Sequence, residues 1–320
     1  MASPNSTFTE LVSTTFRKHR SEIKDNLSNR NALLKYMMKR GNTRKEDGGL
    51  TIATPLDYQA NSTYQRYSDW DNLNIAASDV ISAAEYQWRQ IALNVVASGR
   101  ELRINSGDSR IINLAKARIK NALRTFNNNF SSDLYSAGTL TNQVNGLQAL
   151  IADAGTGTVG GIDSAAFPFW QNTVIDASVL SVTPSATTIE TGLMLPAWLA
   201  TDRGPDDQPD LIVADSTYYS YFEGSQVSLK RYNDTTNGTA GFVTLKYKNA
   251  DVIYDGNSGI PATHMYFINT NYLDLVVHTD ADLTVMDEVR PVNQDGAVTQ
   301  ILWMGNLTCS NRHLQACIVP

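Results

Sequence analysis

Three glycines have the spacing of a dinucleotide-binding loop: Gly155, Gly157 and Gly160. Such a loop binds a pyrophosphate only where it follows a strand and opens a helix, because the amide groups at the start of that helix then face the phosphates. Here the motif follows a predicted helix over residues 147–152 and leads to Pro168. We therefore predict no nucleotide site at these glycines.

Acidic residues suggest metal binding at two places in the sequence. Asp280 and Asp282 begin like a calcium-binding EF-hand loop, which also needs glycine at its sixth position and glutamate at its twelfth. Those positions hold Val285 and Pro291. The second group lies beside prolines, where we expect a solvated turn; it comprises Asp206, Asp207 and Asp210. Neither place predicts a metal site.

Histidines and catalytic nucleophiles form no recognisable motif. No histidine pairs with another histidine or a cysteine at the spacing of a zinc site; the four are His19, His264, His278 and His313. The sequence has neither a nucleophile elbow nor a Walker loop. We therefore predict a protein that is not an enzyme and has no catalytic residue, cofactor or metal. The alternative, a hydrolase or lyase, would need dispersed carboxylates that meet only in space.

The two cysteines are Cys309 and Cys317. On one strand they would lie about 26 Å apart at roughly 3.3 Å per residue, whereas a disulfide needs Cα atoms within about 7 Å. They can meet only across a hairpin. Because the N-terminus lacks the charged and apolar regions of a secretory signal, we expect a cytoplasmic setting and two reduced thiols.

The composition indicates a protein that meets other protein. The length of 320 residues allows one large domain or two modest ones. Apolar residues make up 42% of the chain, and no apolar run approaches the ~18 residues of a membrane span, so we predict no membrane segment. Charged residues make up 18%, against roughly 25% in an average soluble protein. Such depletion suits an interface, because desolvating charge there is costly.

The net charge of −6 is unevenly distributed. Residues 16–45 contain ten basic and two acidic residues and carry +8, so the rest of the chain carries −14. A basic end on an acidic body suggests an arm that contacts an acidic partner, including another copy of the chain. A solvated helix face explains the pattern equally well. Nucleic acid is a weaker third alternative, because few aromatic residues are interleaved with the charges.

The first elements expected along the chain are two short helices within residues 7–40. Thr7 and Glu10 have the spacing of a capping box. The second helix, residues 31–40, ends at Gly41. Both helices are short and half basic, so we expect them to lie on another part of the assembly.

Residues 48–98 predict a long two-stranded β-ribbon with a polar tip. Its return limb, residues 84–96, alternates in side-chain character and spans about 40 Å at roughly 3.3 Å per residue. A ribbon of two strands is marginally stable alone, so a neighbouring subunit must cover it. The residues that we expect to be buried between subunits are Tyr64, Tyr67, Trp70, Ile91, Leu93 and Val95.

Residues 107–136 form the clearest predicted helix, capped by Asp108 or Ser109 and about 40 Å long at 1.5 Å per residue. An apolar stripe repeats every three or four residues; it comprises Ile112, Ala115, Ile119, Ala122, Phe126, Phe130 and Leu134. Basic residues decorate the helix, and we interpret them as a solvated face rather than a binding patch; they are Arg110, Lys116, Arg118, Lys120 and Arg124.

The rest of the chain predicts an α+β fold with helices and strands in blocks. Residues 137–175 are rich in glycine and threonine, with one short helix at 146–152. The strand 211–214 leads into a helix capped by Asp215 or Ser216. Further strands are expected over residues 242–254, 265–278, 300–307 and 314–319, the last two joined by a turn at 310–312.

This order of parts resembles the major capsid proteins of tailed bacteriophages, which have the Hong Kong 97-type fold. Local segments strengthen the resemblance: GG at 48–49, ASGRE at 97–101, PDLIVA at 209–214 and GNLTCSNR at 305–312. The resemblance covers nearly the whole chain and rests on the combination rather than on one motif.

The resemblance implies a division of labour. Residues 1–47 would form an N-terminal arm and residues 48–104 an extended loop that reaches over an adjacent subunit. Residues 105–185 and 275–320 would form a peripheral domain around a long spine helix, and residues 186–274 an axial domain. The implied function is self-assembly into hexamers and pentamers that close into an icosahedral shell, the capsid of a virion, around double-stranded DNA held without sequence specificity.

Partners follow from the same resemblance. The chain begins directly with the arm, so we expect a separate scaffolding protein or an already trimmed chain, together with a portal and a possible decoration protein. The lysine–asparagine crosslink of some relatives has no matching site here. We also expect the basic arm to dock on a neighbour's acidic surface through Arg40, Arg44 and Lys45. An encapsulin-like bacterial compartment is the alternative within this fold, and a tail or fibre adhesin is disfavoured by the spine helix.

Overall fold

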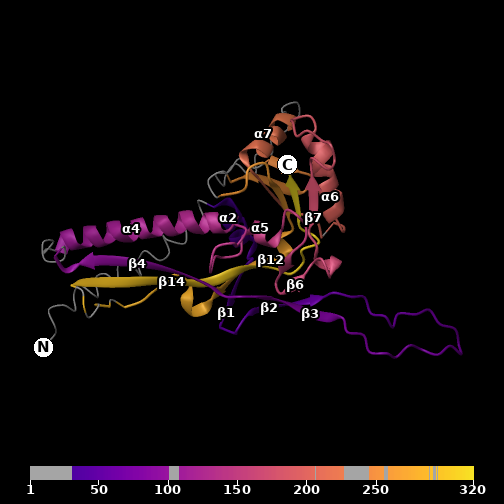
Figure 1. The fold of residues 1–320 in the computed structure, drawn as a ribbon, viewed down its shortest axis with the longest axis horizontal. Coiled ribbons are helices and arrows are strands. Elements are labelled where there is room, and N and C mark those ends of the chain that lie inside the picture. Colours follow the sequence, from indigo (N-terminus) through magenta and orange to yellow (C-terminus); the bar gives the residue numbers. More distant parts are fainter. Residues whose placement is uncertain are drawn as a thin grey trace.

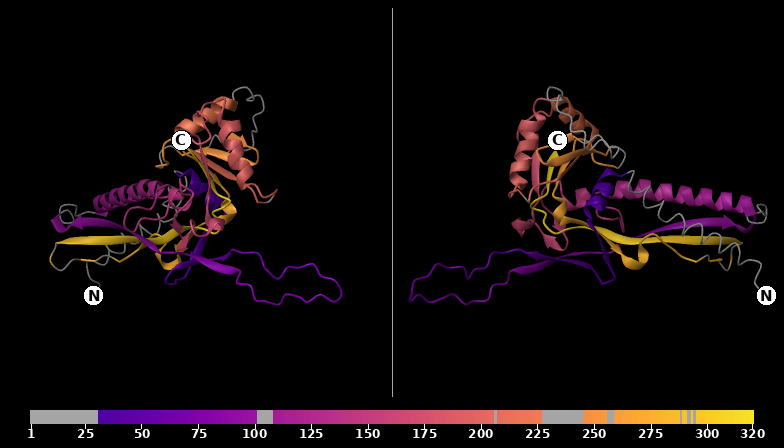
Figure 2. Two further views of the ribbon diagram at one scale, coloured as in Figure 1. Left: turned by 45° about the vertical axis from the view of Figure 1, so that its right-hand side comes forward. Right: turned by 180° about the vertical axis from the view of Figure 1, so that it is seen from behind.

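The computed structural model describes residues 31–320 except 101–107, 206, 227–244, 256–258, 288, 291–292 and 294, and no side chain of residues 108–117. The predicted capping box at Thr7 lies outside the described residues. The molecule is elongated, with a lower unit under a long helix, an upper unit of mixed helices and strands, and a thin loop that projects away from both (Figure 1). Two further views show the same projection (Figure 2).

The long helix α4 (Asp108–Asp133) confirms the predicted spine and lies along strands β4 (Arg89–Ser98) and β14 (Gly296–Cys309) (Figure 1). From Ile119 onward, its apolar stripe packs against this sheet. Phe126 and Phe130 stack with ring centroids 5.3 Å apart, and Phe130 meets Trp303 of β14 edge-on at 4.9 Å. Aromatic pairs at this spacing stabilise a core beyond simple area burial, so helix and sheet are held as one body.

The lower sheet has five strands, in the order β1-β12-β14-β13, with β4 pairing separately to β14. The additional strands are β1 (Thr43–Glu46), β12 (Leu273–His278) and β13 (Thr284–Val285). β4 pairs antiparallel with β14 over ten residue pairs, from Gly296↔Ser98 to Gly305↔Arg89. This pairing gives the sheet its length beneath α4.

The return limb of the ribbon differs from its prediction as one strand over 84–96. β2 (Ile52–Asp57) pairs only with β3 (Ile81–Tyr86), and the chain then leaves the ribbon and continues as β4 against β14. The physical reason is that β14 offers ten partners and a core under α4, whereas β2 offers six and a mostly exposed ribbon. The true ribbon is therefore short, and the loop beyond it is long.

The upper unit is a six-stranded sheet in the order β7-β15-β11-β8-β10-β9. Its strands are β7 (Thr173–Asp176), β8 (Leu211–Ala214), β9 (Leu245–Tyr247), β10 (Ala250–Tyr254), β11 (Met265–Ile268) and β15 (Ala316–Val319). Side chains alternate between two cores: Ile212 and Ala214 pack with the helices, whereas Leu211 and Val213 join the core of the lower unit. The helical elements are η2 (Ile189–Met194), α6 (Leu195–Thr201) and α7 (Ser216–Ser225).

Two predicted strand arrangements are corrected at the junction of the units. The run 265–278 is not one strand but β11 and β12, separated by η5 (Thr270–Tyr272) and placed in different sheets. Likewise β14 and β15 do not form a hairpin, because β14 belongs to the lower sheet and β15 to the upper. Asn269 and Gln315 tie the two crossings together: the Asn269 amide donates to Gln315 Oε1 at 2.9 Å, and Gln315 Nε2 donates to the Asn269 carbonyl at 3.1 Å.

Short elements complete the body and confirm local signals. Helix α2 (Ala32–Arg40) is capped by Asn31 and ends at Gly41, whose φ of 82° suits glycine. Asp215 caps α7 by accepting from the amides of Thr217 and Tyr218. The remaining elements are α5 (Leu147–Leu150), β5 (Thr158–Val159), β6 (Ile162–Asp163), η1 (Pro168–Trp170) and η6 (Thr279–Ala281). Within the described chain, no helix has the length and apolarity needed to cross a membrane.

Arg312 is fully buried where the chain passes from β14 to β15. Its guanidinium donates to the carbonyls of Leu150 (2.6 Å) and Trp170 (3.0 Å) and to Oδ1 of Asn172 (2.9 Å). Burial lowers the pKa of this group. The three acceptors come from two separate segments, α5 and the end of η1 with the residues after it, so one planar side chain joins both segments to the crossing.

Replacing Arg312 with alanine should lower the free energy of unfolding by about 3 kcal/mol or more, because three buried acceptors lose their donor. Arg312→Lys should recover only part of the loss, since one ammonium cannot reproduce the planar fork. Urea unfolding monitored by circular dichroism measures both, with exposed Arg124→Ala as the control. Equal stability of Arg312→Ala and wild type would contradict this role.

Both cysteines are free thiols, as predicted, and both are buried. Burial raises the pKa of Cys309 and of Cys317 from 9.0 to about 12. A thiol reagent at about pH 8 should therefore label neither in the native protein and both in denaturant. Because the unfolded thiols ionise first, their contribution to stability is complete below pH 9 and lost as the pH rises towards 12. Rapid native labelling would contradict the burial.

Candidate inter-subunit interface

The extended loop beyond β2 and β3 holds its shape mainly by side-chain hydrogen bonds. Gln65 spans the loop: its Nε2 donates to the carbonyl of Asn72 at 3.0 Å, and its Oε1 accepts from the amide of Asn74 at 3.0 Å. Nearer the base, the hydroxyls of Ser62 and Ser78 lie 3.3 Å apart. Asn and Gln side chains thus replace the ladder that a regular ribbon would have.

The tip of this loop exposes large apolar side chains. Trp70 is 97% exposed, Ile75 93% and Tyr64 80%. Tyr67 and Leu73 are exposed beside them. An exposed apolar group of this size on a projecting loop marks a surface that another molecule covers. The structure shows Tyr64, Tyr67 and Trp70 exposed, and their burial against another subunit stays a prediction.

The other apolar candidates, Ile91, Leu93 and Val95, lie elsewhere. They occupy the face of β4 that packs against the core of their own subunit, and each is half-buried. Sequence alternation identified this face correctly but not what covers it. Much of the cover comes from inside the chain, because β4 left the ribbon to join β14 beneath α4. These three residues are brought together with the core and not with the loop tip.

Among the described residues, the opposite face of the β4–β14–β13 sheet pairs uncharged side chains across β4 and β14. Its cross-strand pairs are Ala92↔Leu302, Asn94↔Gln300 and Val96↔Val298. Beside them, Met286 donates its amide to the carbonyl of Gln300, and Val289 bridges Val298. Val96, Met286 and Val289 are each about half exposed. We name these eight residues the uncharged face.

Sequence reasoning missed the uncharged face. The signal was present as strict alternation over residues 296–304, where even positions are exposed or half-buried and most odd positions are buried. Both sets are largely apolar, so the pattern alone does not say which side faces outward. The face emerges only when β4 and β13 are placed on either side of β14.

The basic residues expected to dock on a neighbour are paired within the chain. Arg40 Nη1 lies 3.0 Å from Asp210, Arg44 Nη2 2.9 Å from Glu46, and Lys45 Nζ 3.2 Å from Asp282. An already neutralised cation gains less from a second acid than a free one. The basic residues before position 31 lie outside the described part of the chain.

The predicted solvated turn around Asp207 and Asp210 is corrected, since both side chains hold the junction of the units. Asp210 accepts from the amide of Thr270 at 2.9 Å and from its hydroxyl at 2.5 Å. Asp207 accepts from Asn269 Nδ2 at 2.9 Å and from the Tyr272 hydroxyl at 3.2 Å. The crossing η5 supplies donors that a solvent-facing turn would not. Asp206 lies outside the described residues.

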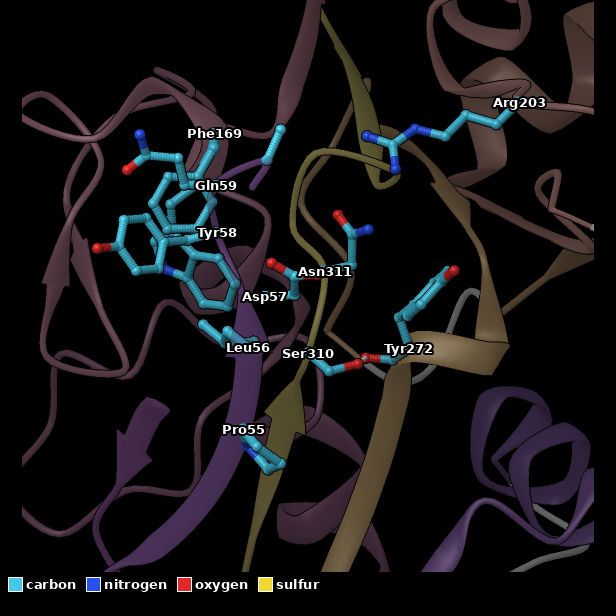
Figure 3. A pocket seen from close by; sticks show the side chains of 12 residues that line it. Pro55, Leu56, Asp57, Tyr58, Gln59, Phe169, Arg203, Tyr272, Ser310 and Asn311 are labelled. Carbon is cyan, nitrogen blue, oxygen red and sulfur yellow. Dashed lines mark hydrogen bonds between the residues drawn. The ribbon is translucent and has the colours of Figure 1, made fainter. Parts of the chain in front are cut away.

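A pocket of about 760 Å³ opens at the base of the extended loop (Figure 3). One wall is aromatic and apolar, with the rings of Tyr58 and Phe169 5.8 Å apart beside Leu56. From the opposite side Arg203 reaches toward Asn311 (Figure 3). The other lining residues are Pro55, Asp57, Gln59, Ala60, Trp170, Tyr272 and Ser310.

Two polar groups define the electrostatics of this pocket, the Tyr272 hydroxyl and the Arg203 guanidinium. Burial and the neighbouring Asp207 carboxylate raise the pKa of Tyr272, which keeps that hydroxyl neutral. Among the interactions of the described residues, Arg203 forms no ion pair, so its guanidinium is available. No cluster of three His, Cys, Asp or Glu side chains suited to a metal occurs in the described ranges.

Comparison with known proteins gives a likeness of fold. No family model and no curated protein matches the sequence. Among solved structures, the capsid asymmetric unit of cyanophage A-1(L) has a TM-score of 0.61 at 16% identity, over 87% of this chain and 90% of that one. Mycobacterium phage Bobi gives 0.55 at 10% identity, over 88% and 89%. The virus-like particle from Pyrococcus furiosus gives 0.50 at 13% identity, over 94% and 98%.

These values confirm the predicted α+β fold of tailed-phage capsid subunits.

Arg40 allows a test of whether it pairs with Asp210 of its own chain or docks on a neighbouring subunit. Replacing Arg40 with glutamate sets a carboxylate against Asp210 and should lower the free energy of unfolding by about 1 kcal/mol, the scale of an exposed ion pair. Chemical denaturation of unassembled protein measures the change. Lys39→Glu, one residue away on α2, is the control and should leave stability unchanged. Unchanged stability of Arg40→Glu with lost assembly would favour the docking role instead.

Proposed function

We propose that this chain is the major capsid protein of a tailed bacteriophage, a structural subunit that assembles into the icosahedral shell around double-stranded DNA. The observation that carries the proposal is the extended loop, whose aromatic tip projects from a body of capsid fold and is exposed in the part of the subunit that the structure describes. A projecting loop with exposed aromatic side chains suits a subunit that contacts its neighbours.

The loop and the uncharged face would allow subunits to associate head-to-tail. The loop leaves one end of the molecule, and the β4–β14–β13 sheet extends toward the other (Figure 1). Unlike surfaces at opposite ends form heterologous contacts, which close into rings when the rotation permits. We propose that the loop of one copy lies on the uncharged face of the next. Hexamers and pentamers are the rings that a closed icosahedral shell requires.

The stability of such a shell comes from the number of contacts that each subunit makes with its neighbours. Each subunit in a shell is held by several neighbours at once, so that individually weak contacts become collectively stable. We assign residues 1–47 to the arm, 48–104 to the extended loop, 105–185 with 275–320 to the peripheral domain, and 186–274 to the axial domain. The six-stranded sheet takes β7 and β15 from the peripheral segments, so the two domains share it.

The partners follow from the assembly. We propose a separate scaffolding protein that guides closure, a portal at one vertex, and double-stranded DNA against the inner face without sequence specificity. A decoration protein is compatible with the exposed surface. An encapsulin-like bacterial compartment, which would share the fold, is the second candidate. Its shells would hold a cargo protein rather than DNA.

Negative-stain electron microscopy of the purified recombinant protein, paired with light scattering, tests the proposal. We expect closed shells, tubes, or isolated hexamer and pentamer rings. Deletion of residues 60–75 should abolish them while leaving the melting temperature unchanged, because those residues add nothing to the core. Leu140→Ser, which removes an exposed apolar side chain outside the loop, is the control and should assemble normally.

Two outcomes would overturn the proposal. Normal shells from the deletion variant would end the role of the loop. A stable monomer that persists at all concentrations and with a scaffolding protein co-expressed would favour the hydrolase alternative.

A further inference from the structure

The loop tip carries charged groups of both signs around its exposed tryptophan. Asp69 lies directly before Trp70, and Arg66 lies three residues before Asp69. Asp71, after Trp70, is engaged in the tip itself, where it accepts from the amide of Ser68 at 2.8 Å. Neither Asp69 nor Arg66 contacts a charged or polar partner among the described residues. The tip therefore presents an aromatic ring, a free carboxylate and a free guanidinium.

The pocket at the loop base presents the matching set. Its aromatic wall of Tyr58 and Phe169 offers a surface for a ring. Arg203 enters from one side, and the carboxylate of Asp57 lies between that arginine and the aromatic wall (Figure 3). Arg203 and Asp57 are both exposed and without ion pairs in the described part of the chain. The aromatic ring, the carboxylate and the guanidinium of the tip thus have complementary groups in the pocket: the aromatic wall, the Arg203 guanidinium and the Asp57 carboxylate.

The reach of the loop fits a second copy rather than the same chain. The tip points away from its own body in every view (Figures 1 and 2), so it does not fold back onto its own pocket. Trp70 lies thirteen positions after Asp57 in the chain, a reach of about 40 Å at roughly 3.3 Å per residue. The 26 residues of α4 measure about 39 Å at 1.5 Å each. One loop thus spans about one body length.

The position of the pocket also suits the proposed path of the loop. Ser310 and Asn311, which line the pocket, follow directly after the last residue of β14. A loop that lies along β14 from its Gly296 end therefore arrives at the pocket where the strand stops. The 14 residues of β14 span about 46 Å at roughly 3.3 Å per residue, again comparable with the loop.

We propose that the pocket receives the loop tip of a second copy of this chain, with Trp70 against the ring wall of Tyr58 and Phe169 and the Asp69 carboxylate on the Arg203 guanidinium. The Arg66 guanidinium of the tip pairs with the Asp57 carboxylate of the pocket, which would otherwise repel Asp69. This inference rests on the proposed assembly function and names the residues that join one subunit to the next.

A charge exchange tests the contact. Asp69→Arg and Arg203→Asp should each raise the protein concentration needed for shells by about tenfold or more, because each sets like charges together. The double variant restores opposite charges and should return to within about threefold of wild type. Shell yield by sedimentation and negative-stain microscopy gives the readout. Asp79→Arg, an exposed acid of the same loop away from the tip, is the matched control and should assemble normally.

A second measurement does not depend on closed shells. A variant carrying Asp69→Cys and Arg203→Cys should form, on mild oxidation, a ladder of reducible oligomers on a non-reducing gel. The native thiols are buried and do not contribute. Asp79→Cys with Arg203→Cys should give no ladder, and thermal unfolding should be unchanged in every variant because the substituted residues are exposed.

The outcomes separate the inference from the function on which it rests. Wild-type shells together with unaffected single variants, or no ladder from the cysteine pair, would overturn the pocket contact and leave the capsid function standing. Failure of the double variant to recover would also count against it. Absence of shells and of crosslinked oligomers from every sample would overturn both.

Discussion

The pairing of β4 with β14 is the interaction on which the rest of the molecule depends. It takes the return limb away from the ribbon, so β2 and β3 share only six residue pairs. The chain between them must then hold itself by side-chain amides such as that of Gln65, and its aromatic tip stays exposed. The same pairing sets α4 on one side of the sheet and leaves the uncharged face on the other.

The junction between the two sheets connects the lower and upper units into one body. Two crossings of the chain, β11 to β12 and β14 to β15, pass between the sheets side by side, and Asn269 and Gln315 bond one to the other. Arg312 then ties this crossing to two loops from inside the core. A buried cation is costly unless its donors are satisfied, and here they are.

Local structure could be predicted from the sequence because its causes are local. The stop of α2 at Gly41, the stripe of α4 and the cap of α7 at Asp215 each depend on residues a few positions apart. The partner of a strand does not. Residues 265–278 read as one strand because nothing in the apolar pattern shows that the halves enter different sheets. The pocket was equally hidden, since its lining comes from five separate segments.

The uncharged face determines how the contacts of a shell would respond to salt and to temperature. Contacts between charges weaken as salt screens them, but a face made of Ala92, Val96, Val298 and their neighbours has little to screen. Association of apolar surface instead weakens on cooling, because its driving force near room temperature is largely entropic. The part of the contact made by this face would tolerate changes of ionic strength and weaken in the cold, whereas the charge pairs proposed at the pocket would weaken as salt is added.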